Sequence, residues 1–160
     1  MDIFEFAIEK EKYTEQYYKD LAEKTDNPGV KRILFLLASE ENKHLQVIEE
    51  LKNEIPVVAE SDLIENAMDI LKKMSEGKEQ IELNADHIRI YEKALEFEQA
   101  SLGFYNEKAD ITKDDGQKKI FLLLAGEERK HILLIEKIIQ FLIKPKTWLE
   151  NAEIFHSEDF

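Results

Sequence analysis

The sequence predicts an all-α protein, and three observations support this prediction. Only 5 of the 160 residues are Gly and 3 are Pro, so few positions favour the tight turns of β structure. Charged residues make up 36% of the chain and hydrophobic residues 43%, a balance typical of long helices with one polar face. Hydrophobic residues also recur at steps of three and four along four long segments. We therefore expect a bundle of four long helices.

We expect the first two helices to form a hairpin that covers approximately residues 2–53. A first helix from about Asp2 to Thr25 is indicated by side chains at helical spacing, namely Phe4, Ile8, Glu11, Thr14, Tyr18 and Leu21. Asn27 can cap the next helix and Pro28 suits its first position, so a second helix should run from Pro28 to about Asn53. Because the turn is short, the two helices must be antiparallel.

The second half of the chain repeats the first at an offset of 87 residues, without a gap. Residues 25–52 laid over residues 112–139 match at 13 of 28 positions, which indicates a duplication. The repeat therefore predicts a second antiparallel hairpin over residues of about 85–144, with its turn at Asp114-Asp115-Gly116.

The remaining segments connect and end the two hairpins. Residues of about 54–84 form a long crossover, in which Ser61-Asp62 can cap a short helix of its own. The tail of about 145–160 is expected to form a short C-terminal helix that begins near Thr147. We interpret residues 1–160 as a single domain.

Charge and composition exclude several classes of function. The chain has 22 Lys+Arg and 35 Asp+Glu, so its net charge is −13, and it has no run of basic residues to bind nucleic acid or an anionic membrane surface. It has no Cys for a disulfide, a thiolate metal site or an iron–sulfur cluster. The sequence shows neither a signal peptide nor an apolar stretch long enough to cross a bilayer, so we expect a cytoplasmic protein.

Each hydrophobic stripe of the four long helices contains one carboxylate, which is costly to bury without a partner. In the second and fourth helices, the Glu is followed three residues later by a His on the same face. Four carboxylates and two imidazoles therefore converge in the middle of the bundle. The six candidate metal ligands are Glu11, Glu41, His44, Glu98, Glu128 and His131.

The charges of these side chains indicate what they bind. Four carboxylates and two neutral imidazoles carry −4, which two divalent cations neutralise. Oxygen donors with one imidazole for each metal favour iron, with manganese as an alternative, over zinc. The competing interpretation is a duplicated structural hairpin without metal, whose Glu residues lie at the edge of the stripe.

The two Glu-x-x-His motifs and the two upstream glutamates resemble the rubrerythrin branch of the ferritin-like superfamily, over nearly the whole chain. The resemblance implies a ferritin-like four-helix bundle that holds two iron ions. It also implies that Glu41 and Glu128 bridge the metals, with the other four side chains as terminal ligands. Tyr18 and Tyr105 lie two turns beyond the upstream glutamates, where tyrosines of the family can hydrogen-bond a ligand carboxylate; the alternative is that they are ordinary core residues.

The sequence departs from the family pattern at three points. Without Cys there is no rubredoxin-like domain, so electrons must come from a separate donor protein. Leu95 stands where rubrerythrins have an additional Glu. Asn42 stands where bacterioferritins have their haem-binding Met, so no haem is expected.

Glu40 and Glu127 also repeat, but they are turned about 100° from the ligand face, and we expect them in surface ion pairs.

The resemblance implies an oxidoreductase that reduces hydrogen peroxide or dioxygen at a di-iron centre. The alternative is a ferroxidase that feeds an iron store, and an enzyme that oxidises an organic substrate is also left open. The apolar tail around Trp148 and Phe155 has to be buried on the bundle or on a second subunit. We therefore expect a homodimer or a larger homo-oligomer.

Overall fold

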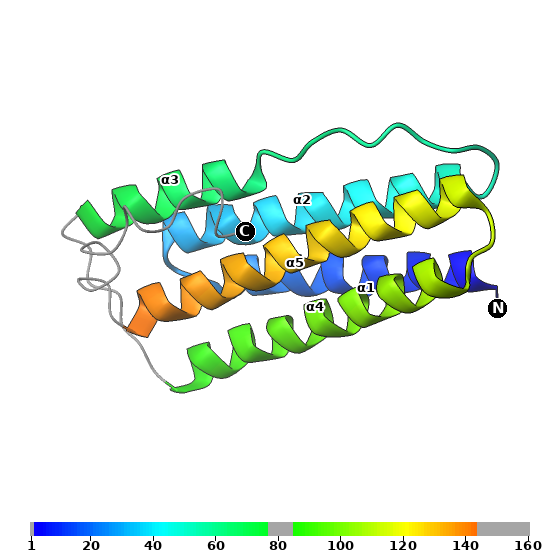
Figure 1. Cartoon of the computed structure of the whole chain (residues 1–160). Helices are drawn as coiled ribbons and strands as arrows, with labels where there is room; N and C mark the ends of the chain where they lie inside the picture. Colours follow the sequence, from blue (N-terminus) through cyan, green and yellow to red (C-terminus); the bar gives the residue numbers. More distant parts are fainter. Residues whose placement is uncertain (1, 77–84, 144–160) are drawn as a thin grey trace.

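The computed structural model describes residues 2–76 and 85–143, and these form five helices without a strand. Figure 1 shows them in chain order. They are α1 (Ile3–Lys24), α2 (Pro28–Leu51), α3 (Leu63–Glu76), α4 (Ala85–Ile111) and α5 (Asp115–Ile143). The all-α prediction is thus confirmed. The expected C-terminal helix, with Trp148 and Phe155, lies outside the described residues.

The helices begin where the sequence provides capping side chains. Asn27 accepts a hydrogen bond from the Val30 amide at 3.0 Å and so caps α2. Asp114, its counterpart in the repeat, accepts one from the Gln117 amide at 2.8 Å and caps α5. The same local chemistry therefore makes both hairpin turns.

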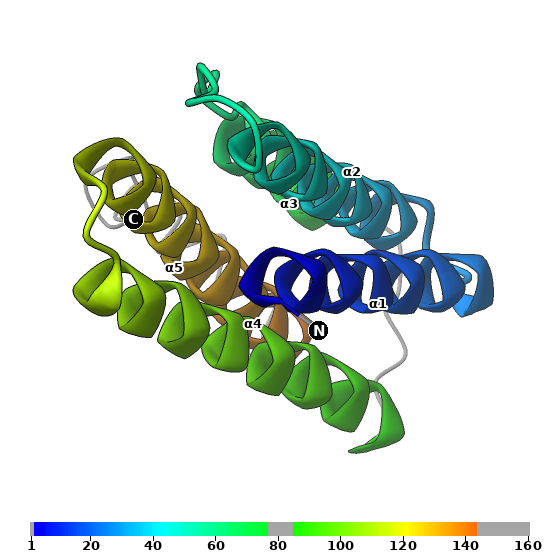
Figure 2. The same cartoon turned by 90° about the vertical axis from the view of Figure 1, so that its right-hand side faces the viewer.

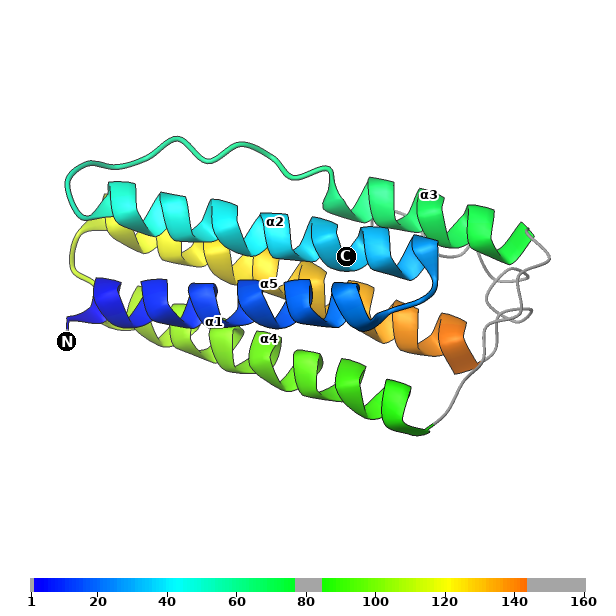
Figure 3. The ribbon, with the colours of Figure 1, turned by 180° about the vertical axis from the view of Figure 1, so that it is seen from behind.

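The four long helices form two antiparallel hairpins, α1 with α2 and α4 with α5, which face one another (Figure 2). The connection from α2 returns along that helix, so α3 packs beside the first half of α2 and also contacts α5 (Figure 3). Helix–helix contacts are much denser within each hairpin than between the two hairpins. Within residues 2–76 and 85–143, no helix is long and apolar enough to span a membrane.

The buried side chains form two hydrophobic clusters at opposite ends of the bundle. One includes Tyr18, Leu34 and Leu71 and takes in α3. The other includes Ile8 and Tyr105 and lies toward the start of α1. Along every long helix, the predicted ligand residues fall between the residues of these two clusters. A polar layer therefore separates the two parts of the core.

Candidate metal centre

All six predicted ligands are buried together in this polar layer. Each long helix contributes one glutamate, and α2 and α5 each add a histidine one turn further on. Between 0% and 4% of each residue is exposed, for Glu11, Glu41, His44, Glu98, Glu128 and His131. Four carboxylates inside a bundle cost far more free energy than their own hydrophobic contacts return, so this layer needs a chemical partner.

The two histidines contact glutamates of the opposite helix. The Nδ1 atom of His44 on α2 lies 3.0 Å from Oε1 of Glu128 on α5. The Nδ1 atom of His131 on α5 lies 3.1 Å from Oε1 of Glu41 on α2. The two rings are parallel within 4°, with centroids 5.3 Å apart. The site therefore has an approximate two-fold symmetry that follows the sequence repeat.

The potential ligand atoms form two four-residue groups, and in each group the atoms lie within 4.8 Å of one another. Both groups contain Glu41 and Glu128. The first group is completed by Glu11 and His44, and the second by Glu98 and His131. Two adjacent positions that share two carboxylates suit a pair of metal ions with Glu41 and Glu128 between them.

Two buried tyrosines join the hairpins through the outer carboxylates. Tyr18 of α1 donates a hydrogen bond to Oε1 of Glu98 on α4 at 2.6 Å. In the symmetric position, Tyr105 of α4 donates to Oε1 of Glu11 on α1. Burial and the nearby carboxylates raise the pKa of both tyrosines, so each hydroxyl keeps its proton and remains a donor.

The carboxylates cannot all be charged when they are alone. Burial, followed by the charges of neighbouring carboxylates, raises the pKa of Glu41 and of Glu128 well above the ordinary value. Burial acts in the same direction on Glu98, but the charge of His131 and several hydrogen bonds outweigh it and lower the Glu98 pKa. The two central glutamates therefore bind protons more readily than ordinary carboxylates, and divalent cations can replace these protons.

Buried polar atoms without a hydrogen-bond partner indicate whether divalent cations fit this site. Within the described residues, five buried side-chain atoms have no hydrogen-bond partner, and all belong to the six predicted ligands. They are Oε2 of Glu11, Glu98 and Glu128, and Nε2 of His44 and His131. Orphaned buried oxygens are rare in proteins and are costly. Carboxylate oxygens with one imidazole for each metal suit Fe(II) or Mn(II), so the residues present fit a dimetal centre.

The prediction of surface ion pairs for Glu40 and Glu127 is partly wrong. Each does pair with a lysine of its own helix, at 3.3 Å, through Lys43 and Lys130 respectively. However, Glu40 is only 6% exposed, and both carboxylates lie within 4.8 Å of the histidine nitrogens. Their faithful repetition along the sequence was the signal that could have identified them.

Leu95 and Asn42, the two positions that depart from the rubrerythrin and bacterioferritin patterns, make ordinary packing and hydrogen-bond contacts. Leu95 is partly buried and packs on the hydrophobic cluster that contains Tyr18, so no additional carboxylate enters the site there. Asn42 donates a hydrogen bond from Nδ2 to Oε1 of Glu15 at 3.0 Å.

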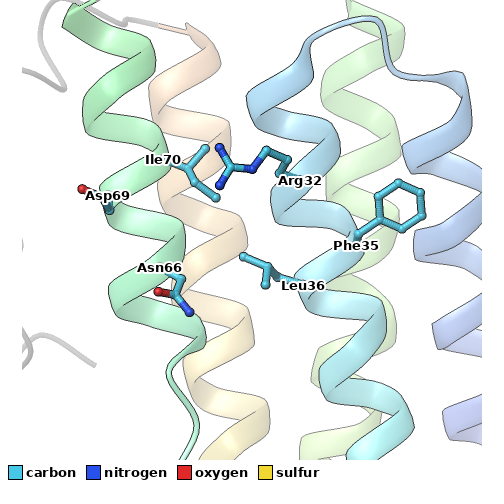
Figure 4. A pocket seen from close by; sticks show the side chains of 6 residues that line it. All are labelled: Arg32, Phe35, Leu36, Asn66, Asp69 and Ile70. Carbon is cyan, nitrogen blue, oxygen red and sulfur yellow. The ribbon is translucent and has the colours of Figure 1, made fainter.

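A pocket between α2 and α3 is separate from this centre (Figure 4). It is lined by Arg32, Phe35 and Leu36 of α2 and by Asn66, Asp69 and Ile70 of α3. None of the six predicted ligands lines it, so it is not an entrance to the carboxylate layer.

Comparison with known proteins agrees with this geometry. The sequence model of the rubrerythrin family matches residues 2–139, which is most of the chain. No curated protein and no solved structure matches the chain. The chain therefore belongs to the rubrerythrin family, whose members are di-iron carboxylate proteins.

Proposed function

We propose that this protein is a di-iron oxidoreductase that reduces hydrogen peroxide or dioxygen to water with electrons from a separate donor protein. One observation carries the proposal: two adjacent four-residue groups share Glu41 and Glu128, so that two metals can lie side by side. Two iron ions, when bound, supply two electrons as each passes from Fe(II) to Fe(III). Reduction of one peroxide to two waters uses two electrons and two protons, and reduction of one dioxygen to two waters uses four electrons and four protons, the other two electrons coming from the donor protein.

The side chains of the chain itself hold and shield this centre. Glu11 and Glu98 serve as outer ligands, and the tyrosine hydroxyls on their Oε1 atoms fix how each carboxylate is turned. The layers above and below exclude bulk water, because their leucine and isoleucine side chains are buried. These side chains are Ile8, Leu37, Leu124 and Ile135, with Leu95 partly buried beside them.

The test is the metal content of the chain. The protein is loaded anaerobically with Fe(II), passed through gel filtration and analysed for metal, with absorbance recorded before and after addition of peroxide. Two irons per chain and a new charge-transfer band on oxidation support the proposal. No retained metal overturns it and favours a duplicated structural hairpin. The same analysis on protein as purified shows whether iron or manganese is the metal taken up in the cell.

A pair of variants tests the shared glutamates. Since Glu41 and Glu128 belong to both groups, replacing either by Ala should abolish binding at both positions. Glu49 is exposed on α2 and provides a matched control, because Glu49→Ala removes a carboxylate without touching the centre. Two metals retained by Glu41→Ala or Glu128→Ala would exclude that residue as a bridge.

The mass in gel filtration separates this function from iron storage. A hollow cage built from many 18.8 kDa chains supports a ferroxidase that feeds an iron core, whereas a dimer supports the peroxide or dioxygen reductase. Oligomerisation and a location in the cytoplasm are parts of the proposal that rest on the sequence.

A further inference from the structure

A second pair of carboxylates lies beside the two imidazole rings. Glu40 and Glu127 each precede a central glutamate in the sequence. One oxygen of each, together with one nitrogen of His44 and one of His131, all lie within 4.8 Å of one another. This four-residue group is distinct from the two groups that make up the dimetal centre, although it contains the same histidines.

Each histidine is placed between two consecutive glutamates of the opposite helix. His131 on α5 contacts Glu41 of α2 through Nδ1, and the charge of Glu40 is among the influences on its pKa. His44 on α2 contacts Glu128 of α5 in the same way, and the charge of Glu127 acts on it. The crosswise arrangement is therefore the same for both rings.

The unsatisfied ring nitrogens indicate a purpose for these carboxylates. Nδ1 of each histidine faces the ligand glutamates, whereas Nε2 is buried without a hydrogen-bond partner in the described part of the chain. A histidine that binds metal through one nitrogen almost always donates the N–H of the other to a carboxylate, a carbonyl or a water. Glu40 and Glu127 each place one carboxylate oxygen within 4.8 Å of a nitrogen of each ring, a separation that one water can bridge.

We propose that Glu40 and Glu127 are positioning residues of the metal centre. Glu40 accepts the Nε2–H of His131 and Glu127 that of His44, which holds each Nδ1 toward the metals. This inference rests on the proposed function, since it requires a metal at Nδ1.

The ion pair of Glu40 does not explain why this carboxylate is buried. Lys43 pairs with Glu40, but the lysine side chain is 62% exposed, and a pair so open to solvent contributes little to stability. The pair uses Oε1 of the carboxylate. A carboxylate accepts at both oxygens, so the lysine and the imidazole can bind to it together.

The test uses Co(II) as the probe in anaerobic titrations, with the metal count per chain, the affinity and the ligand-field spectrum as readouts. Glu40→Ala and Glu127→Ala should still bind two metals per chain but with about 10- to 100-fold lower affinity. Glu40→Gln, which keeps an acceptor oxygen in the same place, should recover part of the loss. Lys43→Met and Lys130→Met are the matched controls: they remove the ion pair, keep the carboxylate and should leave affinity unchanged.

A second readout tests the crosswise assignment. In the Co(II)-loaded protein, each imidazole N–H should give a hyperfine-shifted proton resonance that exchanges slowly with solvent. Glu40→Ala should speed exchange for the N–H of His131, and Glu127→Ala for that of His44. If an alanine variant fails to fold in circular dichroism, the nearly isosteric Gln variants carry the test through the same resonances.

Several results would overturn the inference. Unchanged Co(II) affinity and unchanged imidazole N–H exchange in Glu40→Ala and Glu127→Ala would do so. A loss of affinity in Lys43→Met and Lys130→Met as large as in the alanine variants would also do so. A third metal per chain that disappears in Glu40→Ala would assign these residues to a separate cation site. A wild-type chain that binds no Co(II) would refute the proposed function itself, so the two failures are distinguishable.

Discussion

The hydroxyl of Tyr18 should control metal affinity, and Tyr18→Phe tests this with the loss of one oxygen atom. The hydroxyl donates to Glu98 at 2.6 Å inside the bundle, where both side chains are fully buried. A hydrogen bond to a charged group contributes about 1.5–3 kcal/mol. Since each 1.4 kcal/mol is a factor of about ten, its loss weakens binding by at most roughly 10- to 150-fold, because only the part of this energy that differs between metal-free and metal-loaded protein enters the affinity. Loss of a group that orients a ligand typically costs about 10- to 100-fold, which is the same range.

The neighbouring Tyr17 provides the control for this experiment. Its hydroxyl donates to the backbone oxygen of Ile90 at 2.9 Å and does not contact a ligand carboxylate. Mn(II) affinity of wild type, Tyr18→Phe and Tyr17→Phe is measured by anaerobic calorimetry, with thermal melts in parallel. We expect weaker binding in Tyr18→Phe alone. Equal affinity in all three proteins would refute the role of the tyrosine, and equal losses in both variants would show a general packing effect.

Two further predictions concern stability. Glu41 and Glu128 have raised pKa values, so their contribution to the free energy of unfolding is present at acid pH and is lost as pH rises through those values. Glu98 has a lowered pKa, so its contribution is present above the ordinary value of a glutamate and is lost as pH falls. Glu98 is ionised in both folded and unfolded protein above the ordinary pKa of a glutamate, and the raised pKa of His131 and the lowered pKa of His44 act in opposite directions. The melting temperature of metal-free protein should therefore fall as pH rises above that ordinary value, while that of metal-loaded protein should rise, because ligands must lose protons to bind. A flat profile for metal-free protein would contradict this. Gly29→Ala places a Cβ in steric overlap with Sδ of Met74 on α3 and should destabilise by about 1 kcal/mol, as measured by urea unfolding. Gly103→Ala has open space inside α4 and should stabilise by about 0.5–1 kcal/mol, and the reverse order would contradict the packing seen between α2 and α3.

The repeat explains why so much of the fold could be predicted from the sequence. Because the second half copies the first, each capping residue and each stripe was visible twice, as with Asn27 and Asp114. The expected second helix, from Pro28 to about Asn53, differs from α2 only at its C-terminal end, where the structure ends it at Leu51. The division into one domain and the roles of the six ligands remain predictions.

Pairing between helices could not be predicted in the same way. Spacing along one helix places Tyr18 seven residues from Glu11, a rise of about 10 Å, so the tyrosine cannot reach that carboxylate. The structure shows that it reaches Glu98 on the opposite hairpin instead. The prediction that Glu40 lies on the surface was wrong for a related reason. Periodicity gives the direction of a side chain on its own helix but not how closely a second helix approaches. Both are properties of the packed bundle.

The arrangement of the six predicted ligands indicates that metals bound at the proposed centre would also join the two halves of the protein. The first hairpin supplies Glu11, Glu41 and His44 to one group and shares Glu41 with the other, and the second hairpin does the same with Glu128. Each proposed metal position would therefore take three side chains from one hairpin and one from its partner. Direct helix contacts between the hairpins are few, whereas those within each hairpin are many. Neither hairpin contains a complete site, so binding energy at the centre acts on the docking of the two hairpins. A duplicated sequence that kept a separate site in each half would gain no such coupling.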